Sequence, residues 1–263
     1  MGPIDKTSGM KINRYLLFSI VLVGVLAIGV AGCSAMQAFS GEDEPVGDRE
    51  IVVVLHGLGR SNAAMWSFAN RLRESGYYVK RVGYDSLRQT PQHILDQVAK
   101  QINACCAHQT NTVNFVGHSL GGLLVRDYLQ HYKVDSLGRV VLMGTPNQGT
   151  PLADYFQDTW LMKLAGPTAK QLGTGDKSFP KSLGEPYYPV GVIAGVSEST
   201  SSNETILPGD DDGWVTIEST RLTGMHDFIV VRSGHSMMRY NSEVFHQVVS
   251  FLKTGKFDHE HQQ

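Results

Sequence analysis

The stretch Thr112–Arg126 limits the fold of this chain more than any other part of its sequence. Residues Val113–Val116 are β-branched or aromatic apart from one asparagine, which is typical of a buried strand. Over Leu120–Gln130 the apolar residues return at helical spacing. A strand is therefore expected to turn sharply into a helix here, with Ser119 at the apex of the turn.

Residues Gly117–Gly121 fit the pattern G-x-S-x-G, which is called the nucleophile elbow. A strained turn holds the Ser119 hydroxyl clear of the backbone, and the two glycines leave room where a Cβ would collide. The start of the following helix also presents free N–H groups that stabilise a negatively charged oxygen. We therefore predict that Ser119 is a nucleophile. The pentapeptide alone is also compatible with an ordinary strand–turn–helix whose serine only caps the helix.

A second glycine-rich turn precedes the elbow in the chain. The continuous apolar run Ile51–Leu55 predicts a strand buried on both faces of a parallel sheet, and His56-Gly57-Leu58-Gly59 follows it directly. In folds with an elbow, this position supplies the second half of an oxyanion hole. We expect the backbone N–H groups of Leu58 and Leu120 to form that hole. The alternative is a plain glycine turn in which His56 only satisfies backbone polar groups.

A nucleophilic serine needs a general base, and the base needs a carboxylate that orients it. In chain order the serine comes first, then the acid and then the histidine. The histidines that follow Ser119 are His131, His226, His235, His246, His259 and His261. His235 comes just past the strand predicted at Asp227–Val231, and ligand sites in open α/β sheets lie at the carboxyl ends of strands. His235 is therefore the predicted base, although a lone histidine is more often structural.

The acid is expected in the loop after the strand predicted at Tyr187–Val196. The segment Pro208–Val215 contains three consecutive aspartates beside glycines, and Asp212 stands immediately before a glycine. We predict that Asp212 orients the base, with Asp211 as the alternative. A solvated turn or a weak calcium loop would explain the same cluster. The sequence has no C-x-x-C and no H-E-x-x-H, so we expect no metal site and no cofactor.

Together these segments resemble the bacterial lipase and esterase branch of the α/β-hydrolase superfamily. The resemblance rests on His56-Gly57-Leu58-Gly59, Gly117-His118-Ser119-Leu120-Gly121-Gly122, Gly144-Thr145-Pro146, Asp212-Gly213-Trp214-Val215 and Gly234-His235, and it covers about residues 50–256. It implies that Ser119 is the nucleophile, His235 the base and Asp212 the acid, with the oxyanion donors named above. In that branch Asp-Gly is usually followed by a small or aliphatic residue, so Trp214 is a departure that affects the acyl or alcohol pocket.

The rest of the chain alternates between predicted strands and helices. This pattern indicates the α/β-hydrolase fold, with a mainly parallel sheet, helices on both faces and a small helical cap. The chain has 263 residues, of which 41% are hydrophobic, enough for one large core but not for a second full domain. We expect the hydrolase domain at residues 49–257 and a polar tail at residues 258–263. A net charge of -2 and the lack of a basic stripe argue against a nucleic-acid partner.

The N-terminal part has a different composition. Lys11 and Arg14 precede the run Tyr15–Gly41, which has no charged residue and includes Val30-Ala31-Gly32-Cys33. This order is typical of an export signal, and it resembles a bacterial lipobox in which Cys33 becomes the lipidated first residue. The alternative is an uncleaved transmembrane anchor. We expect a signal or anchor at residues 1–32, a tether at residues 33–48, and an exported protein held on a membrane of the bacterial envelope.

Residues 151–184 show no strand pattern and form the predicted cap. Apolar residues recur there at helical spacing, namely Leu152, Tyr155, Phe156, Trp160 and Leu164. The segment follows the strand that ends in Gly144-Thr145-Pro146, so it should emerge on the catalytic side of the sheet. We expect Trp160 and Leu164 to shield the site or line it for acyl chains. The alternative is that the apolar stripe packs on the core.

Cys105 and Cys106 are neighbours late in the helix predicted from Pro91. A disulfide between adjacent residues fits poorly in helical geometry, so we expect two small, mostly buried thiols. Oxidation is the alternative in an exported protein.

These expectations describe a membrane-tethered serine hydrolase that cleaves lipid-like carboxylic esters through an acyl-enzyme and needs no cofactor. The same residues could transfer the acyl group to an alcohol or amine, or cleave amides or thioesters. A non-catalytic envelope lipoprotein is the alternative of a different class, and it predicts a broken triad. The fold alone does not define the substrate.

Overall fold

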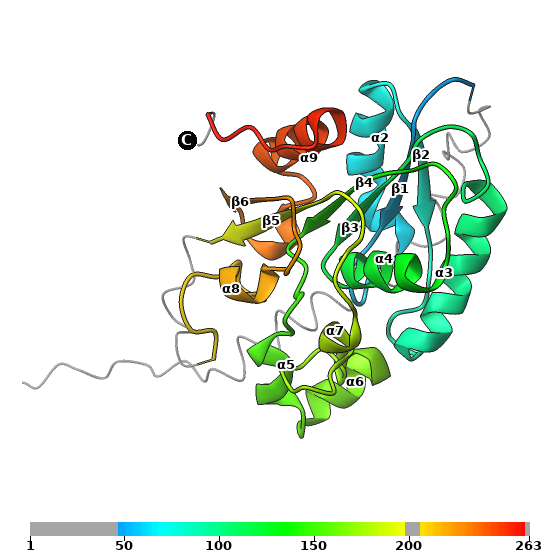
Figure 1. Ribbon diagram of the computed structural model, residues 1–263. Coiled ribbons are helices and arrows are strands. Elements are labelled where there is room, and N and C mark those ends of the chain that lie inside the picture. The colour runs from blue at the N-terminus through cyan, green and yellow to red at the C-terminus, as the bar shows by residue number, and fades with distance from the viewer. Residues whose placement is uncertain (1–46, 198–205, 261–263) are drawn as a thin grey trace, which may run out of the picture. The chain divides into compact units, whose positions relative to one another are not determined.

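The computed structural model describes residues 47–197 and 206–260 (Figure 1). The predicted signal segment, the lipidation site Cys33 and the tether up to residue 46 lie outside these residues. Within the two described ranges, no helix has both the length and the apolar character that a membrane crossing requires.

The described chain contains a sheet of six parallel strands in the order β2-β1-β3-β4-β5-β6. The strands are β1 Ile51–Leu55, β2 Tyr78–Val82, β3 Val113–His118, β4 Leu137–Met143, β5 Val190–Val196 and β6 Asp227–Arg232. The chain leaves β1 toward β2 and then returns to β3 on the other side of β1. The carboxyl ends of β1 and β3 therefore meet at a point where the strand order reverses, which is where such sheets place their ligand sites.

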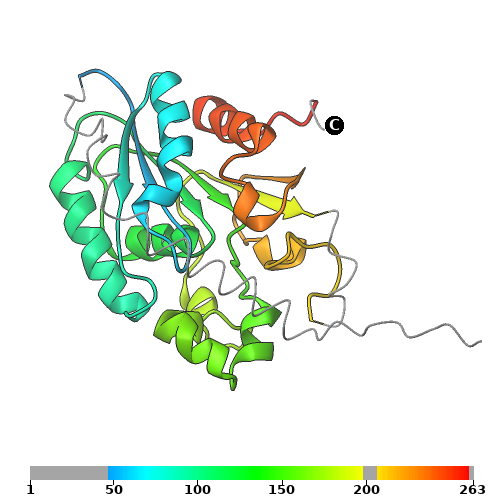
Figure 2. The same cartoon turned by 180° about the vertical axis from the view of Figure 1, so that it is seen from behind.

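Helices cover both faces of this sheet. The helical segments are η2 Asn62–Met65, α2 Trp66–Glu74, α3 Pro91–Cys105, α4 Leu120–His131, α5 Pro151–Phe156, α6 Trp160–Ala169, α7 Phe179–Ser182, α8 Ile217–Thr220, η4 His235–Met237 and α9 Ser242–Thr254. Helices α2 and α9 lie on one face and α3 and α4 on the other (Figures 1 and 2). The expected α/β-hydrolase architecture is confirmed.

Strand β1 shows why its sequence is apolar throughout. Val52 and Val54 belong to the core under α2 and α9, whereas Ile51, Val53 and Leu55 belong to the core under α3 and α4. Successive side chains of a strand point to opposite faces, so a strand covered on both faces has no polar side. Strand β1 therefore lies between the two hydrophobic cores and contributes side chains to both.

Helices α5, α6 and α7 occupy the segment predicted as the cap, and Figure 1 shows them gathered together below the sheet. The apolar stripe does not pack uniformly on the core. Leu152 is buried and Phe156 is partly buried against the core. The large exposed side chains are Tyr155, Trp160 and Leu164, which are 54%, 60% and 51% exposed. The cap therefore presents an apolar outer surface.

A buried arginine holds both ends of the cap segment. Arg126, on α4, donates from Nη1 to Oδ1 of Asn147 at 3.0 Å, shortly before α5 begins. Its Nη2 donates to the carbonyl oxygens of Leu183 at 3.0 Å and Gly184 at 3.3 Å, where the cap ends. Burial lowers the pKa of Arg126 to about 10. The segments at the two ends of the cap, around Asn147 and around Leu183 and Gly184, are the stems of the cap. Both stems are thus bound by one guanidinium group.

The expectation of two free thiols at the end of α3 was wrong, because Cys105 and Cys106 form a disulfide. Helix α3 ends at Cys105, and Cys106 has left helical geometry with φ -140° and ψ -33°. The objection to a bond between neighbours applied to two residues inside a helix. It does not apply where the second residue is the helix cap.

Candidate active site

Ser119 lies between β3 and α4 in a backbone conformation that few residues adopt. Its φ is +58°, and it is the only residue other than glycine with a positive φ in the part of the chain that the structure describes. Its N–H donates to the carbonyl oxygen of Met143 at 2.9 Å, which ties the turn to β4. A Cβ on Gly117 would overlap Gly122, and one on Gly121 would overlap the carbonyl of Leu55. The two glycines let α4 start against the sheet while the serine remains partly exposed.

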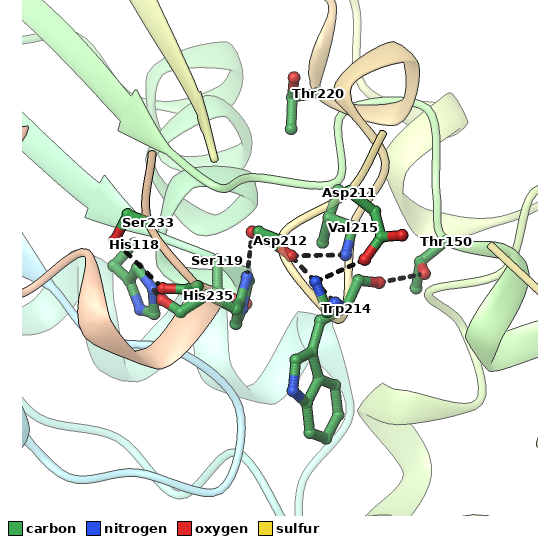
Figure 3. Close-up of polar contacts among 12 residues, drawn as sticks. His118, Ser119, Thr150, Asp211, Asp212, Trp214, Val215, Thr220, Ser233 and His235 are labelled. Carbon is green, nitrogen blue, oxygen red and sulfur yellow. Dashed lines mark hydrogen bonds and ion pairs between the residues drawn. The ribbon is translucent and has the colours of Figure 1, made fainter. Parts of the chain in front are cut away.

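The structure brings Ser119, His235 and Asp212 together from three separate parts of the chain (Figure 3). His235 Nε2 is 3.0 Å from Ser119 Oγ, and His235 Nδ1 is 2.7 Å from Asp212 Oδ2. The side chain of Asp212 is fully buried and that of His235 is 9% exposed. This is the order of contacts that a nucleophile, a base and an orienting acid require.

Asp212 is held by more contacts than the one to His235. Its Oδ1 accepts hydrogen bonds from the N–H groups of Trp214 at 2.9 Å and Val215 at 2.8 Å. The backbone N–H of His235 donates to the backbone carbonyl of Asp212 at 2.8 Å. Asp211 instead accepts from the N–H of Gly213 at 2.6 Å, and burial raises the pKa of its carboxyl group. Of the two candidate aspartates, only Asp212 contacts the ring of His235.

Sequence reasoning missed the role of His118 in this arrangement. Burial, followed by the charge of His235, holds the pKa of His118 well below its ordinary value, so the ring is neutral. Its Nε2 is 2.9 Å from the carbonyl oxygen of His235, and a carbonyl only accepts, so the Nε2 atom carries the proton. The two residues are 117 positions apart, and no local pattern relates them. The sequence indicated only that His118 occupies the first x position of the G-x-S-x-G pattern, directly before Ser119.

The loop that joins β1 to η2 (residues 56–61, the β1–η2 loop) runs beside the serine. A Cβ built on Gly57 would lie 3.1 Å from Cβ and 3.5 Å from Oγ of Ser119, so Leu58 follows a residue in close contact with the nucleophile. Leu120 is the first residue of α4, and its N–H therefore has no partner within the helix. Leu58 thus follows a residue packed against Ser119, and Leu120 follows Ser119 directly, whereas their role as oxyanion donors stays a prediction.

His56 is fixed by its own contacts at the start of this loop. Its Nδ1 is 2.9 Å from the carbonyl oxygen of Gly57, and its ring stacks on Tyr84 with a centroid distance of 3.9 Å. Burial lowers the pKa of His56 to about 4, so the ring is neutral at pH 7. His56 therefore supports the loop backbone.

The ring of Trp214 lies against that of His235. The ring of Trp214 stacks on that of His235 with a centroid distance of 6.1 Å, and Thr150 donates from its hydroxyl to the Trp214 carbonyl at 2.7 Å. Thr150 is the N-cap residue of α5, so the loop that carries Asp212 is attached to the start of the cap. Trp160 and Leu164 lie on α6 with exposed side chains, and no ring contact joins Trp160 to His235 among the described residues.

Gly144 closes the site from the end of β4. Its φ is +54°, and a Cβ built there would lie 3.1 Å from Asp212 Oδ2 and 3.2 Å from His235 Nδ1. The same Cβ would lie 3.0 Å from Sδ of Met238. The backbone at this position therefore packs directly against the Asp212–His235 pair.

Two cavities in the described part of the chain lie away from these residues. One of about 300 Å³ is lined by residues that include Asp127, His131 and Phe179, and one of about 160 Å³ is lined by residues that include Arg126 and Lys181. None of Ser119, Asp212 and His235 lines either cavity. No group of three or more His, Cys, Asp or Glu side chains suited to a metal ion occurs in the described ranges. The candidate site is therefore identified by its chemistry rather than by the size of a cavity.

Comparisons with known proteins agree with this architecture. Residues 51–175, which include Ser119 but not Asp212 or His235, match the family described as palmitoyl protein thioesterase. A mature lipase from Bacillus licheniformis has 19% identity and a TM-score of 0.60, with 81% of this chain and 94% of that chain covered. No curated protein matches the chain by sequence.

Two further solved structures have the same fold. A phospholipase from Legionella pneumophila has 16% identity and a TM-score of 0.55, with 74% of this chain and 56% of that chain covered. A metagenomic carboxyl esterase has 15% identity and a TM-score of 0.52, with 73% of this chain and 68% of that chain covered. The sheet, the elbow and these similarities together show that the chain has the α/β-hydrolase fold, with lipases and esterases among its structural neighbours.

Proposed function

We propose that this protein is a serine hydrolase that cleaves lipid-like carboxylic esters or thioesters. The observation that carries the proposal is the continuous series of contacts from Ser119 Oγ through the ring of His235 to Asp212 Oδ2, at 3.0 Å and 2.7 Å. These three residues lie where the strand order reverses, beside the β1–η2 loop and the start of α4. A non-catalytic envelope protein has no need of this arrangement.

In the first half of the proposed reaction, Ser119 Oγ attacks the acyl carbonyl carbon while His235 Nε2 accepts the hydroxyl proton. The carbonyl oxygen becomes an oxyanion, which the N–H groups of Leu58 and Leu120 stabilise. Asp212 holds the ring orientation and stabilises the imidazolium. When the tetrahedral intermediate collapses, the alcohol or thiol leaves with the proton from Nε2, and the acyl group remains as an ester on Ser119.

In the second half, a water molecule replaces the leaving group. His235 Nε2 accepts a proton from water as its oxygen attacks the acyl carbon, and the same oxyanion donors act again. Collapse releases the carboxylic acid, and the proton on Nε2 returns to Ser119 Oγ. An alcohol or amine in place of water would give acyl transfer, and product analysis with an added acceptor distinguishes the two outcomes.

The family match over residues 51–175 favours thioesters as a second candidate substrate class. A thiolate leaves more readily than an alkoxide, so a thioester depends less on proton donation by His235. We would compare palmitoyl coenzyme A with p-nitrophenyl palmitate under the same detergent conditions. A preference for the coenzyme A ester that disappears in Ser119→Ala would assign the thioesterase activity, and the opposite preference would assign the esterase.

Lipid-like substrates and membrane attachment belong to the same proposal. The cap exposes Tyr155, Trp160 and Leu164, and the structural neighbours include a lipase and a phospholipase. Lipid on Cys33, or in the alternative the uncleaved apolar run before it, would hold the protein on the membrane, where such esters are found. Cys33 lies outside the described residues, so this part rests on the sequence alone.

The direct test is Ser119→Ala, assayed with p-nitrophenyl butyrate. Loss of a triad nucleophile typically lowers kcat by about 10⁶-fold. A fluorophosphonate probe should label the wild-type protein at Ser119 and leave the variant unlabelled. Retention of more than about a tenth of the wild-type rate would mean that Ser119 is not the nucleophile, because both hydrolysis and acyl transfer as proposed proceed through an ester on Ser119.

A further inference from the structure

The loop between β2 and α3 (residues 83–90, the β2–α3 loop) contacts the β1–η2 loop on one side. Ser86 is 2% exposed, and its Oγ accepts a hydrogen bond from the N–H of Gly59 at 2.9 Å. Gly59 has φ +66°, and a Cβ there would lie 3.6 Å from Leu87 Cδ2. Tyr84 donates its hydroxyl to the carbonyl of His56. The backbone is therefore held on both sides of Leu58 by residues of one neighbouring loop.

The same loop contacts the cap on its other side. Thr168, which is fully buried, donates its hydroxyl to the carbonyl of Gln89 at 2.6 Å. Gly166 interrupts α6 with φ +92°, and a Cβ at that position would overlap the carbonyl of Leu87. The backbone of α6 therefore approaches the β2–α3 loop as closely as a residue without a side chain allows.

A short turn with hydrogen bonds of its own connects the contact at Ser86 with the contact at Gln89. Asp85 Oδ1 accepts from the N–H groups of Leu87 and Arg88, both at 3.2 Å. A carboxylate that bonds the backbone two and three residues ahead stabilises a tight turn. The segment from Ser86 to Gln89 is therefore a tight turn that contacts the β1–η2 loop at one end and the cap at the other.

We propose that Ser86 is a positioning residue for the oxyanion hole, and that docking of the cap on Leu87–Gln89 sets its position. The proposal rests on the proposed hydrolase function. The N–H of Leu58 stabilises the acyl carbonyl oxygen mainly when that oxygen becomes negatively charged. A misplaced loop therefore reduces stabilisation of the transition state more than it reduces substrate binding. Ser86 touches no reacting atom and acts through the N–H of Gly59.

The first arm of the test is Ser86→Ala in the full-length protein, with p-nitrophenyl acetate as substrate. We expect kcat to fall roughly 10–100-fold, as for partial loss of an oxyanion donor, while KM changes less than about twofold. An alkyl trifluoromethyl ketone forms a tetrahedral adduct on the serine, and its inhibition constant should rise by the same factor as kcat falls. A merely structural role would lower the amount of folded protein and leave that inhibition constant unchanged.

The second arm is Thr168→Val, which removes the hydroxyl to Gln89 and keeps the side-chain volume. An acetate ester has no long acyl chain to contact the cap, so we expect any fall in kcat to arise through the loop. Thr220→Val is the matched control, because Thr220 is equally buried and donates to the carbonyl of Ile217 at the same 2.6 Å. We expect Thr168→Val to lower kcat several-fold and Thr220→Val to leave it unchanged. The double variant with Ser86→Ala should lose no more than Ser86→Ala alone.

The possible results separate this inference from the function on which it rests. Absence of Ser119-dependent turnover in the wild-type protein would overturn the proposed function. An active wild-type protein whose Ser86→Ala variant keeps kcat and inhibitor affinity within twofold would overturn the positioning role only. Additive losses in the double variant, or equal losses in Thr168→Val and Thr220→Val, would overturn the connection to the cap.

Discussion

Replacement of Gly144 by alanine is the sharpest structural test of the Asp212–His235 pair, because it adds one methyl group and no polar atom. Gly144 has φ +54°, a conformation that costs a residue with a Cβ about 1–2 kcal/mol. In a chain of this size that corresponds to a fall in Tm of roughly 2–8 °C. Strain alone therefore predicts a modest loss of stability and no specific loss of activity.

The contacts of the new methyl group predict the additional effect. Its carbon would lie 3.1 Å from Asp212 Oδ2, 3.2 Å from His235 Nδ1 and 3.0 Å from Met238 Sδ. Carbon contacts are favourable at about 3.5–4.0 Å, so one or more of these groups has to move by several tenths of an ångström. Catalytic groups tolerate about 0.5 Å of displacement, and about 1 Å costs on the order of 100-fold. We expect kcat to fall roughly tenfold, with KM nearly unchanged.

The matched control is Gly224→Ala, in the turn before β6. Gly224 has φ +79°, but a Cβ there would lie 3.5–3.8 Å from its nearest neighbours, all atoms of Pro186. It carries comparable strain without a close contact at the site. Both variants would be assayed with p-nitrophenyl butyrate and by thermal unfolding. If Gly144→Ala loses stability as Gly224→Ala does but keeps the wild-type kcat, the packing argument is refuted.

Three other changes test separate parts of the proposal. Asp212→Asn should lower kcat by about 10⁴-fold, whereas Asp211→Asn should change it little; the reverse order in the same ester assay would transfer the acid role to Asp211. Trp160→Ser should lower kcat/KM about tenfold for long-chain esters and spare acetate esters, with little change in Tm. A uniform loss with a large fall in Tm, as truncation of a buried tryptophan produces at about 3–5 kcal/mol, would contradict a substrate role. Cys33→Ser should leave the signal uncut and abolish incorporation of labelled fatty acid, whereas a wild-type protein with an intact N-terminus and no lipid would indicate a plain membrane anchor.

Features encoded by neighbouring residues could be predicted from the sequence. The elbow is specified within Gly117–Gly121, because one strained serine and two glycines define the turn, and the buried runs such as Ile51–Leu55 define the parallel strands. His235 and Asp212 could be nominated because the order of such residues along the chain follows from the fold. The structure shows their contacts, and their catalytic roles stay predictions that an activity assay tests.

Features that depend on distant residues could not be predicted. The bond from His118 to the carbonyl of His235 and the bond from Gly59 to Ser86 join loops that are adjacent only after the sheet has formed. The prediction of free thiols assumed that Cys105 and Cys106 both lie inside the helix. Helix α3 ends at Cys105, so Cys106 is free to form the disulfide. The apolar stripe of the cap gave its helical period but not which residues face outward, since exposure depends on what the cap packs against.

The attachment of both cap stems to Arg126 has a consequence for how such a protein can change over evolution. The chain leaves and re-enters the hydrolase scaffold at points held by one side chain, so residues 148–182 form an insertion on a fixed base. The entropy of closing a loop rises slowly with its length, by about 0.6 kcal/mol per doubling. The insertion can therefore be lengthened, shortened or exchanged for another without rebuilding the sheet or the elbow. A cap grafted from another hydrolase onto these two stems would transfer substrate preference while the reaction chemistry stays where it is.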